Sequence, residues 1–252
     1  MRKLYTFLKY QYNNKILLWI IIMALTSIAF TYGNIKIYDG IVITGLCAKD
    51  MMLIGSGYNF PIYAGISVIK IMIVTYIDNR PDMLIRYNSK KEIFIYQCTS
   101  AFITALIDVV IMYLATILFA YLMLGVYDNW SEIGSLFYKM VTKRDLPLDI
   151  GVSDACIYFN MIIRKTLIIW LVAIAGLFSE IWFKKLKTVI VIVILICAYS
   201  RISSYGFMGL DLRVIQMYNM PQVIIKTIIL LVICILFVIT GAILSKKRQF
   251  YK

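Results

Sequence analysis

The chain alternates between long apolar runs and short polar segments that are rich in lysine and arginine. An apolar run of roughly 20 residues is long enough to cross a membrane as an α-helix. The pattern therefore predicts an all-α, polytopic membrane protein that forms a single domain over residues 1–252. Six spans are expected, with five or seven as alternatives. The predicted spans are 16–32, 58–77, 93–126, 161–183, 188–207 and 223–244.

The third predicted span, 93–126, is unusually long. A helix of this length measures roughly 50 Å, whereas the hydrocarbon core of a bilayer is roughly 30 Å thick. No proline interrupts the run, and no glycine occurs in it before Gly125. Because the run is too short for two crossings with a turn, we expect one long helix that tilts or projects beyond the bilayer.

The polar segments predict the elements between the spans. Residues 1–15 place apolar and basic side chains on different helix faces, which predicts an interfacial helix, with a plain basic lead-in as the alternative. Residues 34–57 are expected to form an external loop, and residues 127–160 a small external cap. Residues 200–222 are half apolar and interrupted by glycine and proline, which predicts re-entrant or interfacial helices on the outer side.

Composition and charge agree with a membrane protein. The 252 residues are 62% hydrophobic and 15% charged, and the mean hydropathy is +0.85. A soluble domain of this composition would have too little polar surface to cover itself. The net charge of +13 would suggest a nucleic-acid partner for a soluble protein. Here the basic residues gather in short loops, which is typical of the cytoplasmic side. We therefore expect both termini in the cytoplasm, a cell-membrane location and no nucleic-acid partner.

The residue types exclude several kinds of chemistry. The chain has no histidine, and its five cysteines form no CxxC pair, which argues against most zinc sites and against histidine-based acid–base catalysis. A Gly-rich phosphate loop is also absent from the sequence. We expect no catalytic residues, no metal and no cofactor in this chain, so it is not expected to be an enzyme. Cys47 and Cys156 fall in predicted external segments, which leaves a disulfide between them open.

Asp108 is the only acidic residue deep within a predicted span. Charge is costly in hydrocarbon and commonly functional, so Asp108 marks a candidate intramembrane polar site for ions or protons. The alternative is a protonated or hydrogen-bonded aspartate that faces neighbouring helices. Lys70 is an imperfect partner, because it is expected to reach the inner interface instead. Arg164 and Lys165 are expected at the outer end of the fourth span, whose apolar part then begins toward Thr166.

Residues 78–92, between the second and third spans, carry helix signals of their own. Pro81 suits the first turn of a helix, and Asp78 or Asn79 could cap it. Such a helix would present apolar and basic side chains to a partner's groove, whereas a plain solvated loop has little need for the apolar ones. The residues assigned to this contact are Pro81, Met83, Leu84, Arg86, Tyr87, Lys90 and Lys91.

The layout resembles the membrane subunits of ABC-2 type transporters. The segment MRKLYTFLKYQYNNK is similar to their basic elbow helix, and IDNRPDMLIRYNSKKEIF is similar to their cytoplasmic coupling helix between spans two and three. Within it, IRYNSKK looks like a stretch found in Firmicute permeases. The helices expected within Ser200–Gln222 and the basic tail SKKRQFYK also match the family layout. The long segment between spans three and four departs from it.

The resemblance implies a permease subunit without an ATPase of its own. ATP and Mg would bind only in a separate ABC ATPase subunit, and a second copy of the chain or a sister permease would complete the transporter. It also implies a Gram-positive source, membrane lipid around the chain, and the export of amphipathic or antimicrobial peptides such as bacteriocins. Two alternatives stay open: an ion- or proton-coupled carrier or channel that uses Asp108, and a non-transporting membrane protein for peptide immunity.

Overall fold

The computed structural model describes residues 16–38, 45–57, 60–78, 89–142, 151–182 and 218–247. The elements in these ranges are α2 (Ile16–Tyr38), α3 (Ala48–Gly57), α4 (Phe60–Asp78), α6 (Lys90–Leu124), α7 (Leu136–Thr142), α8 (Asp154–Trp182) and α11 (Met220–Lys247). All are helices, as predicted. Four of them, α2, α6, α8 and α11, are long and apolar enough to cross a membrane, which agrees with a membrane-embedded, multi-pass chain.

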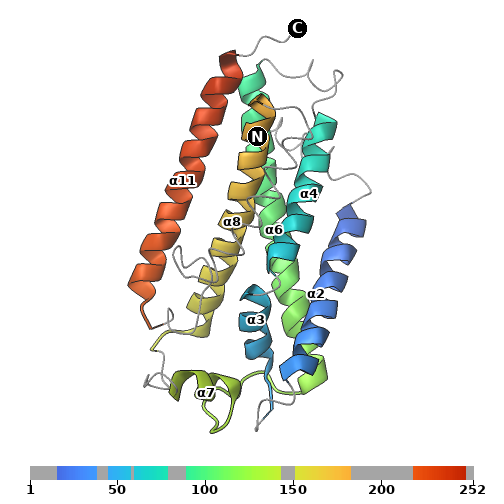
Figure 1. The fold of residues 1–252 in the computed structure, drawn as a ribbon, viewed down its shortest axis with the longest axis vertical. Helices are drawn as coiled ribbons and strands as arrows, with labels where there is room; N and C mark the ends of the chain where they lie inside the picture. Colours follow the sequence, from blue (N-terminus) through green and yellow to red (C-terminus); the bar gives the residue numbers. More distant parts are fainter. Residues whose placement is uncertain are drawn as a thin grey trace.

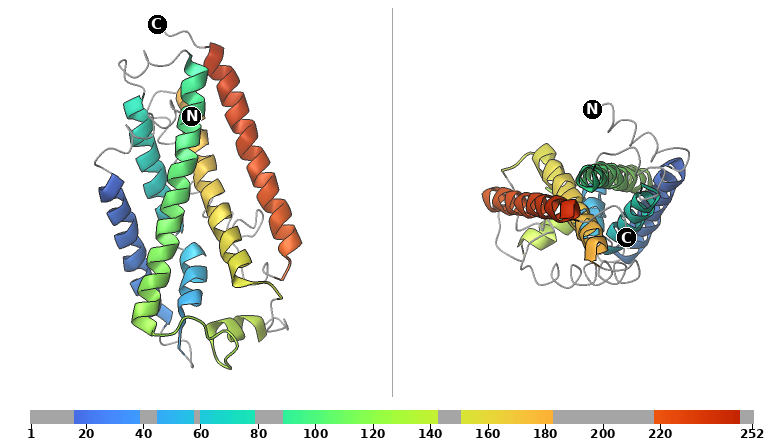
Figure 2. Two further views of the ribbon diagram at one scale, coloured as in Figure 1. Left: turned by 180° about the vertical axis from the view of Figure 1, so that it is seen from behind. Right: turned by 90° about the horizontal axis from the view of Figure 1, so that it is seen from above.

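The long helices lie side by side along the long axis of the molecule (Figure 1). At one end of the bundle α4 ends, α6 begins, and both α8 and α11 end; we call this the Lys90 end. At the opposite end, the α7 end, α6 ends, α8 begins and α7 lies across the base. Figure 1 and the left view of Figure 2 show that α3 sits at the α7 end and that α4 follows it along the axis.

The long helix α6 is defined by a cap at each end. Ser89 has extended backbone angles, and its side chain accepts a hydrogen bond from the backbone N–H of Glu92, as an N-cap serine does. Gly125 has a φ of 70°, and its N–H donates to the carbonyl of Tyr121 at 2.9 Å, which ends the helix. The prediction of a single long helix here is confirmed: the 35 residues between these caps measure roughly 50 Å.

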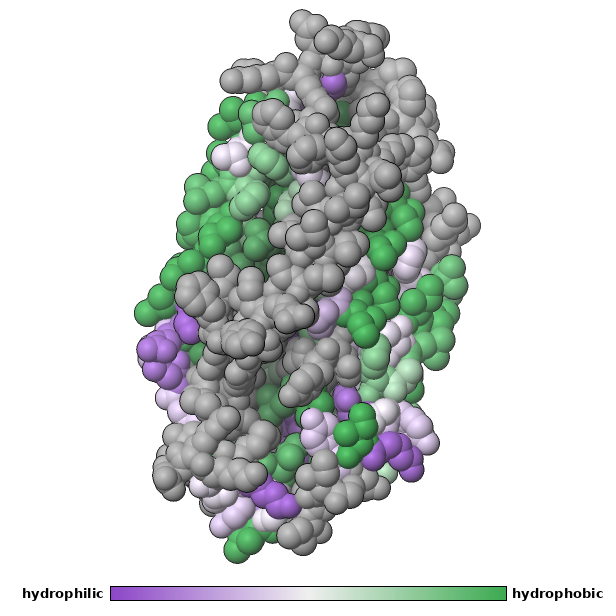
Figure 3. All heavy atoms as spheres, viewed as in Figure 1, coloured by the Kyte–Doolittle hydropathy of each residue, from purple (hydrophilic) through white to green (hydrophobic). Residues whose placement is uncertain are grey.

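The helix α8 is the most enclosed of the four long apolar helices. Of its most apolar window, 67% is buried inside the protein, compared with 22% for α11. It packs against α4, α6 and α11. The side chains that α2 and α11 leave exposed are largely isoleucine and leucine, and Figure 3 shows apolar surface along these two edges of the molecule. Such faces suit contact with lipid tails.

The prediction that the first span ends at Tyr32 is wrong, because α2 continues to Tyr38. Gly33 carries no side chain that could clash, and no atom lies within 4 Å of the position of a Cβ there. The next two residues, Asn34 and Ile35, are buried against the protein. Tertiary packing therefore keeps the chain helical where local propensity favours a break.

The predicted external loop 34–57 contains a further helix, α3, which corrects the prediction. Its first backbone N–H groups have no partner within the helix, as at any helix start. Here the N–H of Ala48 donates to the carbonyl of Val126 at 3.1 Å, and the N–H of Lys49 donates to the carbonyl of Tyr127 at 3.2 Å. These acceptors come from the segment after α6, so the local sequence does not reveal this support for the start of α3.

The fourth predicted span begins too late. Helix α8 starts at Asp154 instead of Met161, so Arg164 and Lys165 lie within the helix and are buried rather than exposed at its outer end. The start was predicted too late because polar side chains lower the hydropathy of the first turns of α8. Several of these side chains are buried against protein. The predicted cap, 127–160, does contain a helical piece, α7.

Several predicted elements lie outside the described residues. These are the interfacial helix at 1–15, residues 79–88 of the coupling segment, the fifth span at 188–207 and nearly all of the segment 200–222. They stay predictions.

The contact between α6 and α11 generates a first prediction. A Cβ placed on Gly241 of α11 would clash with Cζ of the buried Phe94 ring in α6. We expect Gly241→Ala to lower the free energy of unfolding, because overpacking costs about 1–3 kcal/mol and exceeds the gain in helix propensity of about 0.5–1 kcal/mol. Thermal unfolding in detergent measures the change. The matched control is Gly33→Ala, which meets no atom within 4 Å and should be neutral or stabilising; equal stabilities of the two variants would contradict the packing argument.

Candidate functional site

A buried ion pair connects α4 to α6. Asp108 of α6 is fully buried, and its two carboxylate oxygens accept hydrogen bonds from two side chains of α4. Lys70 Nζ lies 2.6 Å from Oδ1, and Ser67 Oγ lies 2.6 Å from Oδ2. Ser67 and Lys70 stand at positions i and i+3 of α4 and therefore share one helix face. The structure thus brings together the two residues of the predicted intramembrane polar site.

The expectation that Lys70 reaches the inner interface is wrong. In a helix the Cα–Cβ bond tilts toward the N-terminus, and long side chains follow that direction. The N-terminus of α4 lies within the bundle and its C-terminus lies at the Lys90 end (Figure 1). The side chain of Lys70 therefore points away from the Lys90 end and reaches the depth of Asp108.

A second buried lysine contacts α4 from α8. Lys165 Nζ lies 4.0 Å from the centroid of the Phe60 ring, within the range of a cation–π interaction. Arg164, beside it, is also buried. Lys165 of α8 therefore contacts the first residue of α4, Phe60. Asp108 of α6 binds Lys70, which lies in a later turn of α4. Charged side chains fix α4 on two neighbouring helices.

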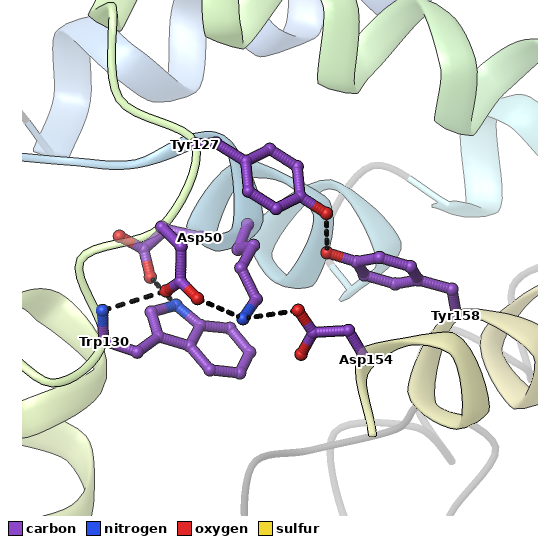
Figure 4. Close-up of polar contacts among 7 residues, drawn as sticks. Asp50, Tyr127, Trp130, Asp154 and Tyr158 are labelled. Atoms are coloured by element: carbon purple, nitrogen blue, oxygen red, sulfur yellow. Dashed lines mark hydrogen bonds and ion pairs between the residues drawn. The ribbon is translucent and has the colours of Figure 1, made fainter. Parts of the chain in front are cut away.

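A polar cluster at the α7 end has Lys49 at its centre. Lys49 Nζ lies 2.6 Å from Asp128 Oδ2, 3.0 Å from Asp154 Oδ2 and 4.2 Å from the centroid of the Trp130 ring. We call these four residues the Lys49 clasp (Figure 4). They come from the first turn of α3, the segment after α6 and the first residue of α8, so the clasp ties three parts of the chain together.

Asp50 and Phe137 hold the Trp130 side chain of the clasp in place. Trp130 Nε1 donates to Asp50 Oδ1 at 3.0 Å, and the Trp130 ring stacks on Phe137 of α7 with 4.3 Å between centroids. The other oxygen of Asp50 accepts the backbone N–H of Cys47 at 3.1 Å, the reciprocal bond of a capping box at the start of α3. Trp130 is therefore held on both its polar edge and its face.

Burial changes the acid–base properties of this region, which lies outside the four long apolar helices. Burial, with the Asp50 charge nearby, raises the pKa of the Cys47 thiol to about 12, so the reactive thiolate is scarce at neutral pH. Burial also raises the pKa of Asp50, against the hydrogen bonds that it accepts. For Lys49, burial lowers the pKa, but its bonds to the two aspartates outweigh this and raise the pKa overall, so Lys49 is cationic at neutral pH.

The residues assigned to partner contact divide into two groups. Lys90 and Lys91 form the first turn of α6, and Lys91 is exposed there. Both stand at the Lys90 end, beside the end of α4 (Figure 1). The other members lie outside the described residues: Pro81, Met83, Leu84, Arg86 and Tyr87.

Sequence reasoning missed the Lys49 clasp and the part that Ser67 takes in the ion pair. The clasp residues were spread over a predicted loop and a predicted cap, and only the fold brings them together. The spacing of Ser67 and Lys70 on one helix face was the available signal for the intramembrane site. Cys47 and Cys156 are both free thiols, so the disulfide left open by the sequence is not formed. Within the described ranges, no three histidine, cysteine or acidic residues gather as a metal site would require.

The ion pair yields a second prediction. Asp108→Asn leaves the buried charge of Lys70 without its counter-charge, and removal of one partner of a buried pair costs about 3–5 kcal/mol. We expect a correspondingly lower thermal unfolding temperature of the purified protein in detergent. The double variant Lys70→Met with Asp108→Leu removes both charges and should recover most of the loss. A single variant as stable as the parent would show that the pair does not hold α4 to α6.

Comparison of the chain with models of protein families, with curated proteins and with solved structures gives no match. The functional proposal therefore rests on the sequence and on the geometry of the described helices.

Proposed function

We propose that the chain is the membrane-spanning permease subunit of an ABC exporter, driven by a separate ATPase subunit. The observation that carries the proposal is the reversal of the chain between α4 and α6. Residues 79–88 connect two helix ends that both belong to the Lys90 end, where α8 and α11 also end. The segment that resembles a coupling helix therefore joins two packed helices at the end whose helix termini carry Lys90, Lys91 and Lys247. We assign this end to the cytoplasm, following the basic-residue rule.

The proposal includes six crossings of the membrane. Helices α2, α6, α8 and α11 supply four, and α4, which covers nearly all of the predicted second span 58–77, supplies a fifth. Because α8 ends at the Lys90 end and α11 begins at the α7 end, the chain has to return between residues 182 and 218. The predicted fifth span, 188–207, is assigned to that return.

In the proposed mechanism, the buried ion pair makes α4 and α6 move together. Nucleotide-driven closure of two ATPase subunits would push on residues 81–91. Because Lys70 and Asp108 join α4 to α6 at 2.6 Å, the two helices would respond as one rigid body, as in other gating motions of packed helices. A second permease copy or a sister subunit would complete the path. The proposed substrates are amphipathic or antimicrobial peptides, and ATP and Mg belong to the ATPase partner.

The state of Asp108 weighs against the alternative of an ion- or proton-coupled carrier. Its two oxygens are engaged by Lys70 and Ser67, and it is fully buried. An ion site would need ligands that remain available to the ion, whereas this carboxylate is used to hold two helices together. A non-transporting immunity protein remains the second alternative, and the ATPase experiment below separates it from a permease.

The orientation is tested with introduced cysteines. Lys91 and Ile133 are both exposed and belong to opposite ends of the bundle. We expect a membrane-impermeant maleimide to label Ile133→Cys on intact cells and to label Lys91→Cys only after the cells are permeabilised. The parent protein, with its native cysteines, supplies the background. Labelling of Lys91→Cys on intact cells would reverse the orientation and remove the basis of the proposal.

The partner is tested by purification from membranes of the native host. We expect an ATPase subunit with nucleotide-binding motifs to purify with the tagged chain. The double variant Leu84→Ala with Arg86→Ala should retain about tenfold less of it, because a few central side chains carry most of the energy of an interface. Ile133→Ala, an exposed apolar residue at the α7 end, is the matched control and should change nothing. If cells that carry the chain stay resistant to the peptide without any ATPase, the result would instead favour the non-transporting immunity protein.

A further inference from the structure

Helix α3 fills the interior of the bundle at the α7 end. Its five consecutive residues Ala48, Lys49, Asp50, Met51 and Met52 are all buried. Since an α-helix turns once in 3.6 residues, five buried residues in a row mean that protein surrounds the helix on every side. α3 packs against α2 and α6, and the view along the axis in Figure 2 shows it among the long helices. Helix α3 therefore occupies the space between the long helices at this end of the bundle.

Polar contacts at one end of α3 hold it in this position. The carbonyls of Val126 and Tyr127 accept its first N–H groups, and Lys49 binds Asp128 and Asp154. The hydroxyl groups of Tyr127 and Tyr158 lie 2.7 Å apart, and their hydrogen bond (Figure 4) joins the segment after α6 to α8 without involving α3. The segment after α6 and α8 therefore contact each other directly, through residues outside α3. The ion pair that links α3 to α8 depends on Lys49.

The Lys49 clasp differs in strength from the ion pair of Lys70. The side chains of Asp128 and Asp154 are 42% and 45% exposed, whereas that of Asp108 is fully buried. Water can solvate the two carboxylates when they separate from Lys49, whereas Lys49 is 5% exposed and reaches water only if α3 moves. The two pairs therefore separate together with a movement of α3. Glycines stand on both sides of α3: Gly45 with a φ of 84° before it, and Gly57 at its end. Glycine gives the backbone freedom to change direction at such joints.

We propose that α3 is a plug, which the Lys49 clasp holds in the interior of the bundle at the α7 end and whose release opens that end. Its role as the gate of an export path rests on the proposed function. The release itself is a property of this chain and needs no transport to be observed.

Cys47 is a native reporter of that release. It directly precedes α3, and its side chain is fully buried beside the clasp. We expect Lys49→Met, which keeps the side-chain length and removes the charge, to raise the rate of Cys47 modification by N-ethylmaleimide about tenfold, because two partly exposed ion pairs are lost together. The full chain is labelled in lipid nanodiscs, and each cysteine is quantified by mass spectrometry. Dividing by the rate in the unfolded protein removes any change in the intrinsic reactivity of the thiol.

Two controls separate release of α3 from general loosening. Glu132→Gln removes an exposed carboxylate at the same end but outside the clasp, and it should leave the rate at Cys47 unchanged. Cys98 of α6 and Cys234 of α11 are buried in the bundle away from α3, and their rates should not change in any variant. Where Lys49→Met fails to fold, Asp154→Asn removes one of the two ion pairs and should raise the rate at Cys47 about two- to fivefold.

An unchanged rate at Cys47 in folded Lys49→Met would overturn the plug, as would equal increases at Cys98 and Cys234. Addition of the ATPase partner and ATP gives the separate test of transport. If Lys49→Met frees Cys47 but nucleotide leaves the parent's rate unchanged, the plug stands and the proposed export function fails.

Discussion

A charge inside a lipid-embedded bundle has to be matched within the protein, because no water is available to solvate it. Asp108 meets this requirement through Lys70 and Ser67, and the requirement fixes how α4 lies against α6. The consequence extends beyond these two helices, since α6 also packs against α2, α3, α8 and α11. The pair of charges therefore holds α4 in the bundle together with the contact of Lys165 with Phe60 and the apolar packing of α4 in the core.

The two lysine clusters show how solvent exposure assigns different roles to similar chemistry. Lys70 and its aspartate are both buried, so separating them would leave charge in a medium of low dielectric constant. Lys49 is buried, but its two aspartates are nearly half exposed, so water replaces Lys49 at the aspartates when they separate and replaces the aspartates at Lys49 once α3 moves. The first pair suits a permanent joint within a moving body. The second suits a contact that is made and broken.

The continuous apolar stretches of the fold could be predicted from the sequence, and the polar stretches that face protein could not. Helices α6 and α11 begin and end within three residues of their predicted limits, because their apolar composition is continuous. Helix α3 and the first turns of α8 were assigned to loops, since a polar residue that faces a protein partner looks in sequence like one that faces water. The direction of Lys70 was missed for a related reason: the sequence shows that a lysine is present but not that a neighbouring helix brings Asp108 within its reach. The partner-contact role of Leu84 and Arg86 stays a prediction, as these residues lie outside the described ranges.

The length of α6 also couples the protein to the thickness of its membrane. At 35 residues, the helix exceeds the hydrocarbon core by roughly 20 Å, so in a thinner or thicker bilayer it accommodates the mismatch chiefly by changing its tilt. Helix α4 cannot keep its own angle while this happens, because the Lys70–Asp108 pair holds it to α6. Lipid chain length therefore acts on the same two helices that meet at residues 79–88.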